Sequence, residues 1–235
     1  MFKLIEKRDI AANTMTFKFD ISGTGYSFKP GQNADISLIN LRYTDEEGIR
    51  RTFSFCNSPT EGQFVEFAMR LRDTAFKKNL KELSLGSLVE ITEPIGTFLL
   101  HKDETKPAVF LAGGIGVAPV RSIVKWATDE KLPHRLILFY SNRNLDTTAF
   151  LQDFENLAKI NPNFIFVPTL TQNLSKDWTY SRGRIDADML KKFVPNLNEA
   201  VFYIAGSPAM VRGMHEVLEA LGIHENIKTE QFDGY

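Results

Sequence analysis

The first hundred residues contain short segments in which apolar side chains recur at every second position or in which β-branched and aromatic residues are enriched. Glycine- and proline-containing turns separate these segments, and one stretch of helical period, Phe76–Leu83, interrupts them. The predicted strands are Thr14–Ile21, Asn33–Ile39, Arg51–Cys56, Gln63–Leu71 and Ser87–Ile91. Closely spaced short strands of this kind predict a small antiparallel β-barrel.

From Lys106 the pattern changes, because continuous apolar runs now alternate with segments of helical period. The predicted strands are Ala108–Ala112, Arg135–Tyr140, Phe164–Thr169 and Ala200–Ala205, and the predicted helices are Val117–Asp129, Thr148–Ile160, Asp186–Phe193 and Pro208–Leu221. Such alternation predicts a doubly wound parallel sheet with helices on both faces. The polar stretch His101–Pro107 separates the two patterns, so we expect a barrel domain over residues 1–102 and an α/β domain over residues 103–235.

Composition narrows the classes of function. The chain has 235 residues, 28 Lys and Arg against 29 Asp and Glu, a net charge of -1 and one cysteine. Proteins that bind a nucleic-acid backbone usually carry a basic excess, and none is present here. One cysteine excludes a disulfide framework, and it also excludes an iron–sulfur cluster held by four thiolates of this chain.

The sequence gives no sign of a membrane span, an export signal or a metal site. Pro107–Val120 is the most apolar stretch and is too short for a span. Charges among residues 3–9 interrupt any signal-peptide apolar region. The histidines, which have no metal-ligand spacing, are His101, His134, His215 and His224. We therefore expect a cytoplasmic protein with no metal, no membrane contact and no nucleic-acid partner.

A glycine-rich loop joins the first strand and helix of the second half. Ala108–Ala112 runs directly into Gly113–Pro119, which opens the next predicted helix. Glycines let the backbone approach a bulky anion, and a helix N-terminus offers free N–H groups and a positive dipole end. Pro119 stands where the dinucleotide fingerprint has its third glycine, and proline is tolerated in a first helical turn. The loop indicates a dinucleotide site, and a tight turn without ligand is the alternative.

The segment Arg51–Ser54 places different chemistry on the two faces of a strand. Arg51 and Phe53 point to one face, and Thr52 and Ser54 point to the other. The arginine would suit a phosphate, the aromatic ring could stack, and the hydroxyl could bond a ring nitrogen. Composition alone favours the alternative, an amphipathic strand with a surface arginine and core phenylalanines.

Six segments, in order along the chain, resemble the ferredoxin–NADP reductase family of FAD-dependent NAD(P)H oxidoreductases. They are Phe28–Gln32 (its Pro-Gly-Gln turn), Arg51–Ser54 (its Arg-x-Tyr/Phe-Ser flavin motif), Glu93–Phe98 (its barrel-closing segment), Gly113–Pro119 (its pyridine-nucleotide loop), Tyr140–Arg143 (its adenosine-ribose strand end) and Ala205–Met210 (its Cys-Gly-x-Pro-x-Met turn). The resemblance covers essentially the whole chain.

The resemblance implies hydride transfer from nicotinamide to FAD and onward transfer of electrons. Arg51 would hold a flavin phosphate, Phe53 would flank the isoalloxazine, and Ser54, the implied catalytic residue, would bond near its N5. The implied cofactor-binding residues are Arg51, Thr52, Phe53, Ser54, Met69, Arg70, Thr74, Ala75, Phe76, Lys77, Gly113, Gly114, Ile115, Gly116, Val117, Pro119, Ser141, Arg143, Gly206, Pro208, Met210 and Phe232. The cofactor would supply the chemistry, and the protein would position the rings.

The sequence departs from the family pattern at several positions. Asp73–Lys78 replaces a Gly-x-x-Ser/Thr segment that cradles the flavin pyrophosphate, so Thr74 or Lys77 would replace the hydroxyl, with Phe76 at the adenine. A solvated lysine face of this helix is the alternative. Ala205 stands where many relatives have a cysteine beside the nicotinamide.

Two further positions have open interpretations. Either terminal aromatic, Phe232 or Tyr235, would cover the flavin, and a frayed terminus is the alternative. Cys56 follows the flavin motif by two residues and is more typical of a buried, inert thiol.

Residues in both predicted domains bear on the choice between NADPH and NADH and between FAD and FMN. Ser141 and Arg143, with Arg182 and Arg184 further along, favour NADPH over NADH, since a carboxylate would favour the free 2′-hydroxyl. The segment at Thr74–Lys78 favours FAD over FMN.

The electron acceptor would be a separate protein such as a ferredoxin, a flavodoxin or an oxygenase component. A basic docking surface for it would comprise Arg70, Arg72, Lys77, Lys78 and Lys81. The alternatives are direct reduction of a small acceptor, such as a quinone or free flavin, and a flavin-binding regulatory module without turnover.

Overall fold

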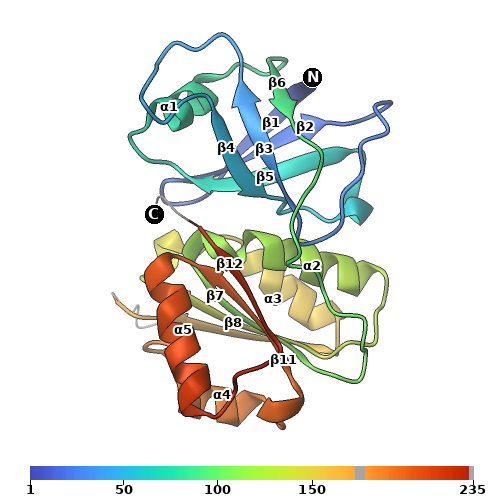
Figure 1. Ribbon diagram of the computed structural model, residues 1–235, viewed down its shortest axis with the longest axis vertical. Coiled ribbons are helices and arrows are strands. Elements are labelled where there is room, and N and C mark those ends of the chain that lie inside the picture. The colour runs from blue at the N-terminus through green and yellow to red at the C-terminus, as the bar shows by residue number, and fades with distance from the viewer. Residues whose placement is uncertain (173–177, 233–235) are drawn as a thin grey trace.

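The computed structural model describes residues 1–172 and 178–232, which build two six-stranded sheets (Figure 1). The first sheet is antiparallel with the order β4-β3-β6-β1-β2-β5. The elements of this domain, in chain order, are β1 (Phe2–Ala11), β2 (Thr14–Asp20), β3 (Asn33–Leu38), β4 (Arg50–Ser54), the turn η1 (Pro59–Glu61), β5 (Phe64–Arg70), α1 (Ala75–Glu82) and β6 (Leu88–Ile91). An isolated bridge between Phe55, just after β4, and Phe67 of β5 joins the edges, so the sheet closes into a barrel.

The barrel core is aromatic. Phe17 and Phe19 of β2 and Phe67 of β5 are fully buried, and Phe55 packs against Phe67 with ring centroids 4.9 Å apart. Phe76 of α1 is also buried, which anchors this short helix on the barrel. Rings of this size bury large apolar areas, and they allow a small barrel to have a stable core.

The second sheet is parallel with the order β10-β9-β8-β7-β11-β12. The elements of this domain, in chain order, are β7 (Ala108–Gly113), the turn η2 (Gly114–Val117), α2 (Ala118–Asp129), β8 (Leu136–Asn142), the turn η3 (Leu145–Thr147), α3 (Leu151–Ile160), β9 (Phe164–Leu170), β10 (Ser181–Arg182), α4 (Ala187–Phe193), the turn η4 (Leu197–Glu199), β11 (Val201–Gly206), α5 (Pro208–Ala220) and β12 (Ile227–Gln231). Helices α2 and α3 cover one face, and α4 and α5 cover the other (Figure 1).

Alternation along the central strand β7 explains this layering. Phe110 and Ala112 pack with α2 and α3, whereas Val109 and Leu111 pack with α4 and α5. A strand buried on both faces is a continuous apolar run, which is how Ala108–Ala112 could be recognised from the sequence. The predicted fold class, an antiparallel barrel followed by a doubly wound parallel sheet, is confirmed.

Three strands were not predicted. Strand β1 has many charged positions that hide its apolar alternation, β12 is a polar edge strand, and β10 has two residues. Helix α3 begins at Leu151 and not at Thr148, because Phe150 adopts a left-handed backbone conformation with φ 57°. No helix within residues 1–172 and 178–232 is long and apolar enough to cross a membrane.

The turn Pro30–Gln32 lies where the barrel meets the second domain. Gly31 has φ +91°, and a Cβ atom there would stand 2.1 Å from the carbonyl oxygen of Phe98 and 3.0 Å from Ile123 of α2. Only glycine fits such a conformation and such a close approach. The turn therefore packs the barrel-closing segment against α2.

Candidate functional site

Two pockets open side by side between the domains. The barrel-side pocket is lined by Thr52, Phe53, Ser54, Ala68, Met69, Arg70, Arg72, Lys77, Ile115, Ala118 and Phe232. The sheet-side pocket is lined by Thr14, Arg70, Gly113, Gly114, Ile115, Ser141, Asn142, Arg143, Thr147, Ala149, Thr171, Ser207 and Met210. Arg70 and Ile115 line both, so the two pockets are neighbours.

Strand β4 supplies the polar floor of the barrel-side pocket. Ser54 is buried and donates a hydrogen bond of 2.5 Å to the carboxylate of Glu230, which lies on β12 of the other domain. Burial raises the pKa of Glu230 to about 7, against hydrogen bonds from Ser54 and Asn33 that favour the charged form. A carboxyl group that titrates near neutral pH therefore lies directly behind the Ser54 hydroxyl.

Glu230 was not among the residues predicted from the sequence. The only available signal was an acidic residue in a short segment near the C-terminus, and its partner is 176 positions away in the chain. No local pattern could have paired them.

Two aromatic side chains also line this pocket. Phe53 packs against Phe76 and Phe67, with ring centroids 5.8 and 6.5 Å away, and stays partly exposed. Phe232 follows β12, and its backbone N–H donates to the carbonyl of Gly206. The structure thus brings the predicted terminal aromatic to the same pocket as Phe53, whereas Tyr235 lies outside the described residues.

The mouth of the barrel-side pocket is cationic. Arg70, Arg72 and Lys77 line it, and none of its described lining residues is acidic. Burial and the nearby guanidinium groups of Arg72, Arg51 and Arg70 lower the pKa of Lys77 to about 8. Crowded, partly desolvated cations favour an anionic ligand such as a phosphate.

Arg51 and the start of α1 are arranged differently from the expectation. Arg51 donates to the Glu47 carboxylate at 2.6 Å and to the carbonyl oxygens of Glu47 and Arg50, both at 2.7 Å. Asp45 accepts a hydrogen bond of 2.8 Å from the backbone N–H of Ala75. The acidic loop at residues 45–47 therefore bonds Arg51, the predicted ligand of a flavin phosphate, and one backbone N–H at the start of α1, whereas Lys77 of the same predicted segment lines the barrel-side pocket.

Other predicted residues near α1 also stay outside the two pockets. The Thr74 hydroxyl caps the helix by accepting from the N–H of Lys77, and Phe76 is buried in the barrel core and not free to meet an adenine. Of this segment only Lys77 lines the barrel-side pocket. A helix whose N-terminal groups are already capped offers little to a phosphate.

The glycine loop forms the back of the sheet-side pocket. It follows β7, which lies between β8 and β11, so it stands at the point where the strand order reverses. Open parallel sheets bind nucleotides at this point, beyond the carboxyl ends of the strands. Gly113, Gly114 and Ile115 line the pocket, and Tyr140 donates to the carbonyl of Gly114.

The remaining residues of the loop support it from behind. A Cβ atom at Gly116 would stand 2.5 Å from the carbonyl oxygen of Ala205, so glycine lets the loop pack on β11. Val117 is buried and Pro119 occupies the first turn of α2, as predicted. The predicted residues that line neither pocket are Arg51, Thr74, Ala75, Phe76, Gly116, Val117, Pro119, Gly206 and Pro208.

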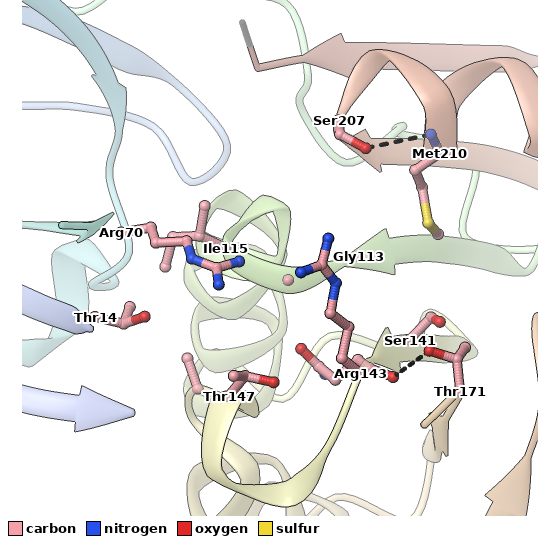
Figure 2. Close-up of a pocket in the computed structure, with 13 residues that line it drawn as sticks. Thr14, Arg70, Gly113, Ile115, Ser141, Arg143, Thr147, Thr171, Ser207 and Met210 are labelled. Carbon is pink, nitrogen blue, oxygen red and sulfur yellow. Dashed lines mark hydrogen bonds between the residues drawn. The ribbon is translucent and has the colours of Figure 1, made fainter. Parts of the chain in front are cut away.

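Two arginines converge on the glycine loop from opposite domains. Figure 2 shows Arg70, from β5 of the barrel, and Arg143, from the loop after β8, extending toward Gly113 and Ile115. Ser141 and Thr171 lie beside Arg143, and no described lining residue of this pocket is acidic. Asn142 is buried at the same edge, and within the described residues its side-chain amide has no hydrogen-bond partner. The arrangement suits a ligand with phosphate and hydroxyl groups.

Cysteine and histidine residues do not contribute to the pockets. Cys56 is fully buried and donates to the carbonyl of Glu66, and burial raises the pKa of its thiol well above the usual value. His101 bonds the hydroxyl of Tyr203, and His134 bonds the carbonyl of His101. Among residues 1–172 and 178–232 no group of three His, Cys, Asp or Glu side chains could hold a metal ion. The prediction of a buried thiol at Cys56 is confirmed.

Comparison with known protein families matches both domains. Residues 1–99 match the model of the oxidoreductase FAD-binding domain, and residues 110–216 match that of the oxidoreductase NAD-binding domain. The chain belongs to the ferredoxin–NADP reductase family. It therefore carries an FAD-binding barrel and a NAD-binding α/β domain, and the two pockets lie in those domains and between them.

Individual relatives match most of this chain at low identity. The phenol hydroxylase P5 protein of Acinetobacter pittii is 26% identical over 97% of this chain and 64% of its own length. The reductase component of propane 2-monooxygenase of Rhodococcus jostii is 26% identical over 86% of this chain and 54% of its own length. The chain thus spans between about half and two thirds of these relatives.

Solved structures share the fold. The Amycolatopsis cytochrome P450 reductase GcoB superposes with a TM-score of 0.83 at 25% identity, over 98% of this chain and 68% of that one. A ferredoxin–NADP⁺ reductase of Neisseria gonorrhoeae, solved with bound FAD and NADP, gives a TM-score of 0.80 at 20% identity over 98% and 97% of the two chains. The pairing of an antiparallel barrel with a parallel sheet is common to all three.

The residues of the barrel-side pocket fit a flavin. Phe53 offers an aromatic face, Ser54 a hydroxyl, and Arg70, Arg72 and Lys77 a cationic site for phosphates. In the other pocket, the backbone of Gly113 and Gly114 borders the cavity with no side chain in the way, which suits a dinucleotide, and a Cβ atom at Gly113 would stand 2.7 Å from the sulfur of Met210.

Proposed function

We propose that this chain is an FAD-dependent oxidoreductase that takes hydride from NAD(P)H and passes electrons to a separate acceptor. The observation that carries the proposal is that the two pockets are adjacent, with Arg70 and Ile115 lining both. When bound, FAD accepts hydride from reduced nicotinamide at its isoalloxazine ring and releases the electrons onward. Two rings held in adjoining pockets meet the requirement of this reaction for close approach.

The side chains of the barrel-side pocket position the flavin and control a proton. Phe53 flanks the ring system. The single proton of the Ser54 hydroxyl is donated to ionised Glu230, so Ser54 donates to the reacting edge of the ring when Glu230 is protonated and itself donates to the Ser54 oxygen. Glu230 keeps the Ser54 hydroxyl oriented and, with a pKa of about 7, can hold or release a proton at neutral pH. Arg70, Arg72 and Lys77 bind the flavin phosphates, and Phe232 covers the pocket until nicotinamide enters.

The sheet-side pocket binds the pyridine nucleotide, with NADPH preferred over NADH. The glycine loop and Arg70 hold the pyrophosphate, while Ser141, Arg143 and Thr171 supply hydroxyl and guanidinium groups without an opposing carboxylate among the described lining residues. Arginine and hydroxyl groups suit a 2′-phosphate, whereas a carboxylate would repel it.

The acceptor is a separate electron-transfer or oxygenase protein. Several relatives are named as reductase components, including those of terephthalate 1,2-dioxygenase of Comamonas and propane 2-monooxygenase of Rhodococcus jostii. Arg72, Lys78 and Lys81 are exposed beside the barrel-side pocket and would attract an acidic partner. Lys78 is already paired with Asp73, so the positive charge that would attract the partner comes mainly from Arg72 and Lys81.

A visible spectrum of the purified protein, followed by anaerobic titration with NADPH and NADH, tests the proposal. We expect flavin absorbance that bleaches with either nucleotide, at a lower concentration of NADPH, and ferricyanide reduction in turnover. A protein that binds FAD but is reduced by neither nucleotide would be a regulatory module, and the proposed activity would be wrong.

A further inference from the structure

The guanidinium of Arg121, in the second turn of α2, joins three separate segments of the chain. It donates to the carboxylate of Glu61 at 3.0 and 3.2 Å, to the carbonyl oxygen of Cys56 at 2.8 Å and to Asp153 at 2.8 Å. Its side chain is 8% exposed. Arg121 lines neither pocket, so its role is not to contact a cofactor.

The contacts of Arg121 to Cys56 and Glu61 cross from the α/β domain to the barrel. Glu61 is itself held in place, because its carboxylate accepts from the backbone N–H of Ser58 at 2.7 Å in a capping box. Next to Arg121, Ser122 donates to the carbonyl of Asn57 at 2.6 Å. Helix α2 is therefore attached to the segment 56–61 through buried, charge-assisted hydrogen bonds, which are stronger than neutral ones.

The contact of Arg121 to Asp153 stays within the α/β domain. Asp153 lies in the first turn of α3, and the ring of Phe150, in its left-handed conformation, stacks 5.1 Å from the guanidinium. Thr147 and Ala149, just before it, line the sheet-side pocket. The same guanidinium thus supports one wall of the nucleotide site.

The place of Arg121 along α2 connects these contacts to the pockets. Ala118, one turn earlier, lines the barrel-side pocket, and the glycine loop that precedes it lines the sheet-side pocket. Three helical residues span only about 4.5 Å, so the loop and the anchor move as one body. A shift of α2 relative to the barrel would shift the nucleotide site by the same amount.

We propose that Arg121 is a positioning residue: its ion pair with Glu61 sets the approach of the bound nicotinamide to the flavin by anchoring the glycine loop to the barrel. This inference rests on the proposed function. The planar fork of arginine can meet Glu61, Cys56 and Asp153 at once, whereas a lysine presents a single point of charge and cannot.

The test compares Glu61→Gln with a matched control, Glu130→Gln, which makes the same substitution at an exposed carboxylate that directly follows α2. Stopped-flow flavin reduction is measured over a range of NADPH concentrations. We expect Glu61→Gln to lower the limiting reduction rate about tenfold, because a small misplacement of reacting groups is costly, and to leave FAD affinity unchanged. Glu130→Gln should reduce flavin at the wild-type rate.

Two further measurements separate positioning from a general loss of structure. Hydrogen exchange of the nucleotide-free holoprotein should show faster exchange in segment 56–61 for Glu61→Gln but not for Glu130→Gln, with other segments unchanged. Ser122→Ala, a milder change at the same junction, should lower the limiting rate in the same direction by about threefold, close to one lost hydrogen bond.

Failure of the Arg121 inference can be told apart from failure of the proposed function. If Glu61→Gln and Ser122→Ala lower the melting temperature but reduce flavin at the wild-type limiting rate, Arg121 has a purely structural role and the inference is wrong. If the wild type is not reduced by either nucleotide, the proposed function fails first. The exchange data then still report whether the anchor holds the domains together.

Discussion

At the scale of single residues, Ser54 is the side chain whose replacement should separate binding from chemistry. Its hydroxyl is held by Glu230 and lines the barrel-side pocket. Ser54→Ala should leave FAD bound, because the aromatic and cationic contacts remain, but slow flavin reduction by about tenfold or more through loss of a preorganised donor. Rapid-mixing absorbance measurements check this. An unchanged reduction rate would show that the hydroxyl does not act on the reacting edge.

Glu230 should make stability depend on pH in a defined window. Its pKa is raised from 4.5 to about 7 by burial, so the folded state disfavours the charged form. Below about pH 4.5 both states are protonated and the group costs nothing; as the pH rises to 7 the unfolded state ionises first, and stability is lost. The loss is complete above pH 7 and amounts to about 3 kcal/mol at most.

Glu230→Gln removes this effect. Urea unfolding of the FAD-free protein at pH 5 and pH 8 should show the variant gaining stability over the wild type as the pH rises. Glu90→Gln, at an exposed position of β6, serves as the control and should show no such trend. If the two variants behave alike, Glu230 is not the titrating group.

At the scale of elements, the acidic loop at residues 45–47 competes with flavin phosphate for Arg51. Glu47 is bonded to Arg51, and Asp45 caps α1. If Arg51 turns to a flavin phosphate, Glu47→Gln should tighten FAD binding by about three- to tenfold, since one exposed ion pair contributes up to about 1 kcal/mol. Flavin fluorescence titration of apoprotein measures this. Glu46→Gln, its exposed neighbour, is the control, and weaker FAD binding in Glu47→Gln would show that the loop is a permanent support.

Replacement by alanine should have opposite effects on stability at two glycines of the second domain. Gly116→Ala places a methyl group 2.5 Å from the backbone oxygen of Ala205 and should destabilise the protein by about 2 kcal/mol or more. Gly213→Ala, in α5 with open space around it, should stabilise by up to about 1 kcal/mol through helix propensity. Thermal unfolding of both proteins checks the signs. Equal shifts would mean that the loop does not need its close approach to β11.

The limits of sequence reasoning follow from the range of each interaction. The apolar run Ala108–Ala112 and the glycine loop are local patterns, and they indicated a dinucleotide-binding domain where the NAD-binding domain model matches residues 110–216. The hydrogen bond from the backbone N–H of Ala75 to the Asp45 carboxylate joins residues 30 positions apart. The hydrogen bond from Ser54 to Glu230 joins residues 176 positions apart. The first contact depends on how distant segments of the barrel pack and the second on how the two domains pack, and no periodicity encodes either. Local patterns therefore predicted the domains, whereas the structure was needed to show which side chains and backbone groups of the candidate site already have partners.

At the scale of the whole molecule, the net charge of -1 conceals a cationic cleft at the junction of the domains. Arg70 belongs to the barrel but lines both pockets, whereas Arg72, two residues later, lines only the barrel-side pocket. Binding of two anionic cofactors therefore depends on local groups, and we expect Arg70 to contact both. We therefore predict that the barrel takes part in nucleotide binding.

Arg70→Gln should accordingly weaken the binding of both FAD and NADP⁺, whereas Arg72→Gln should weaken the binding of FAD alone. Loss of a charge-assisted hydrogen bond costs about 1.5–3 kcal/mol, so we expect the Kd for NADP⁺ to rise about tenfold or more in the first variant and to stay at the wild-type value in the second. Equilibrium titration of holoprotein, kept saturated with FAD, isolates this effect. If Arg70→Gln binds NADP⁺ normally, the nucleotide is held by the α/β domain alone, and the two pockets adjoin without sharing a phosphate ligand.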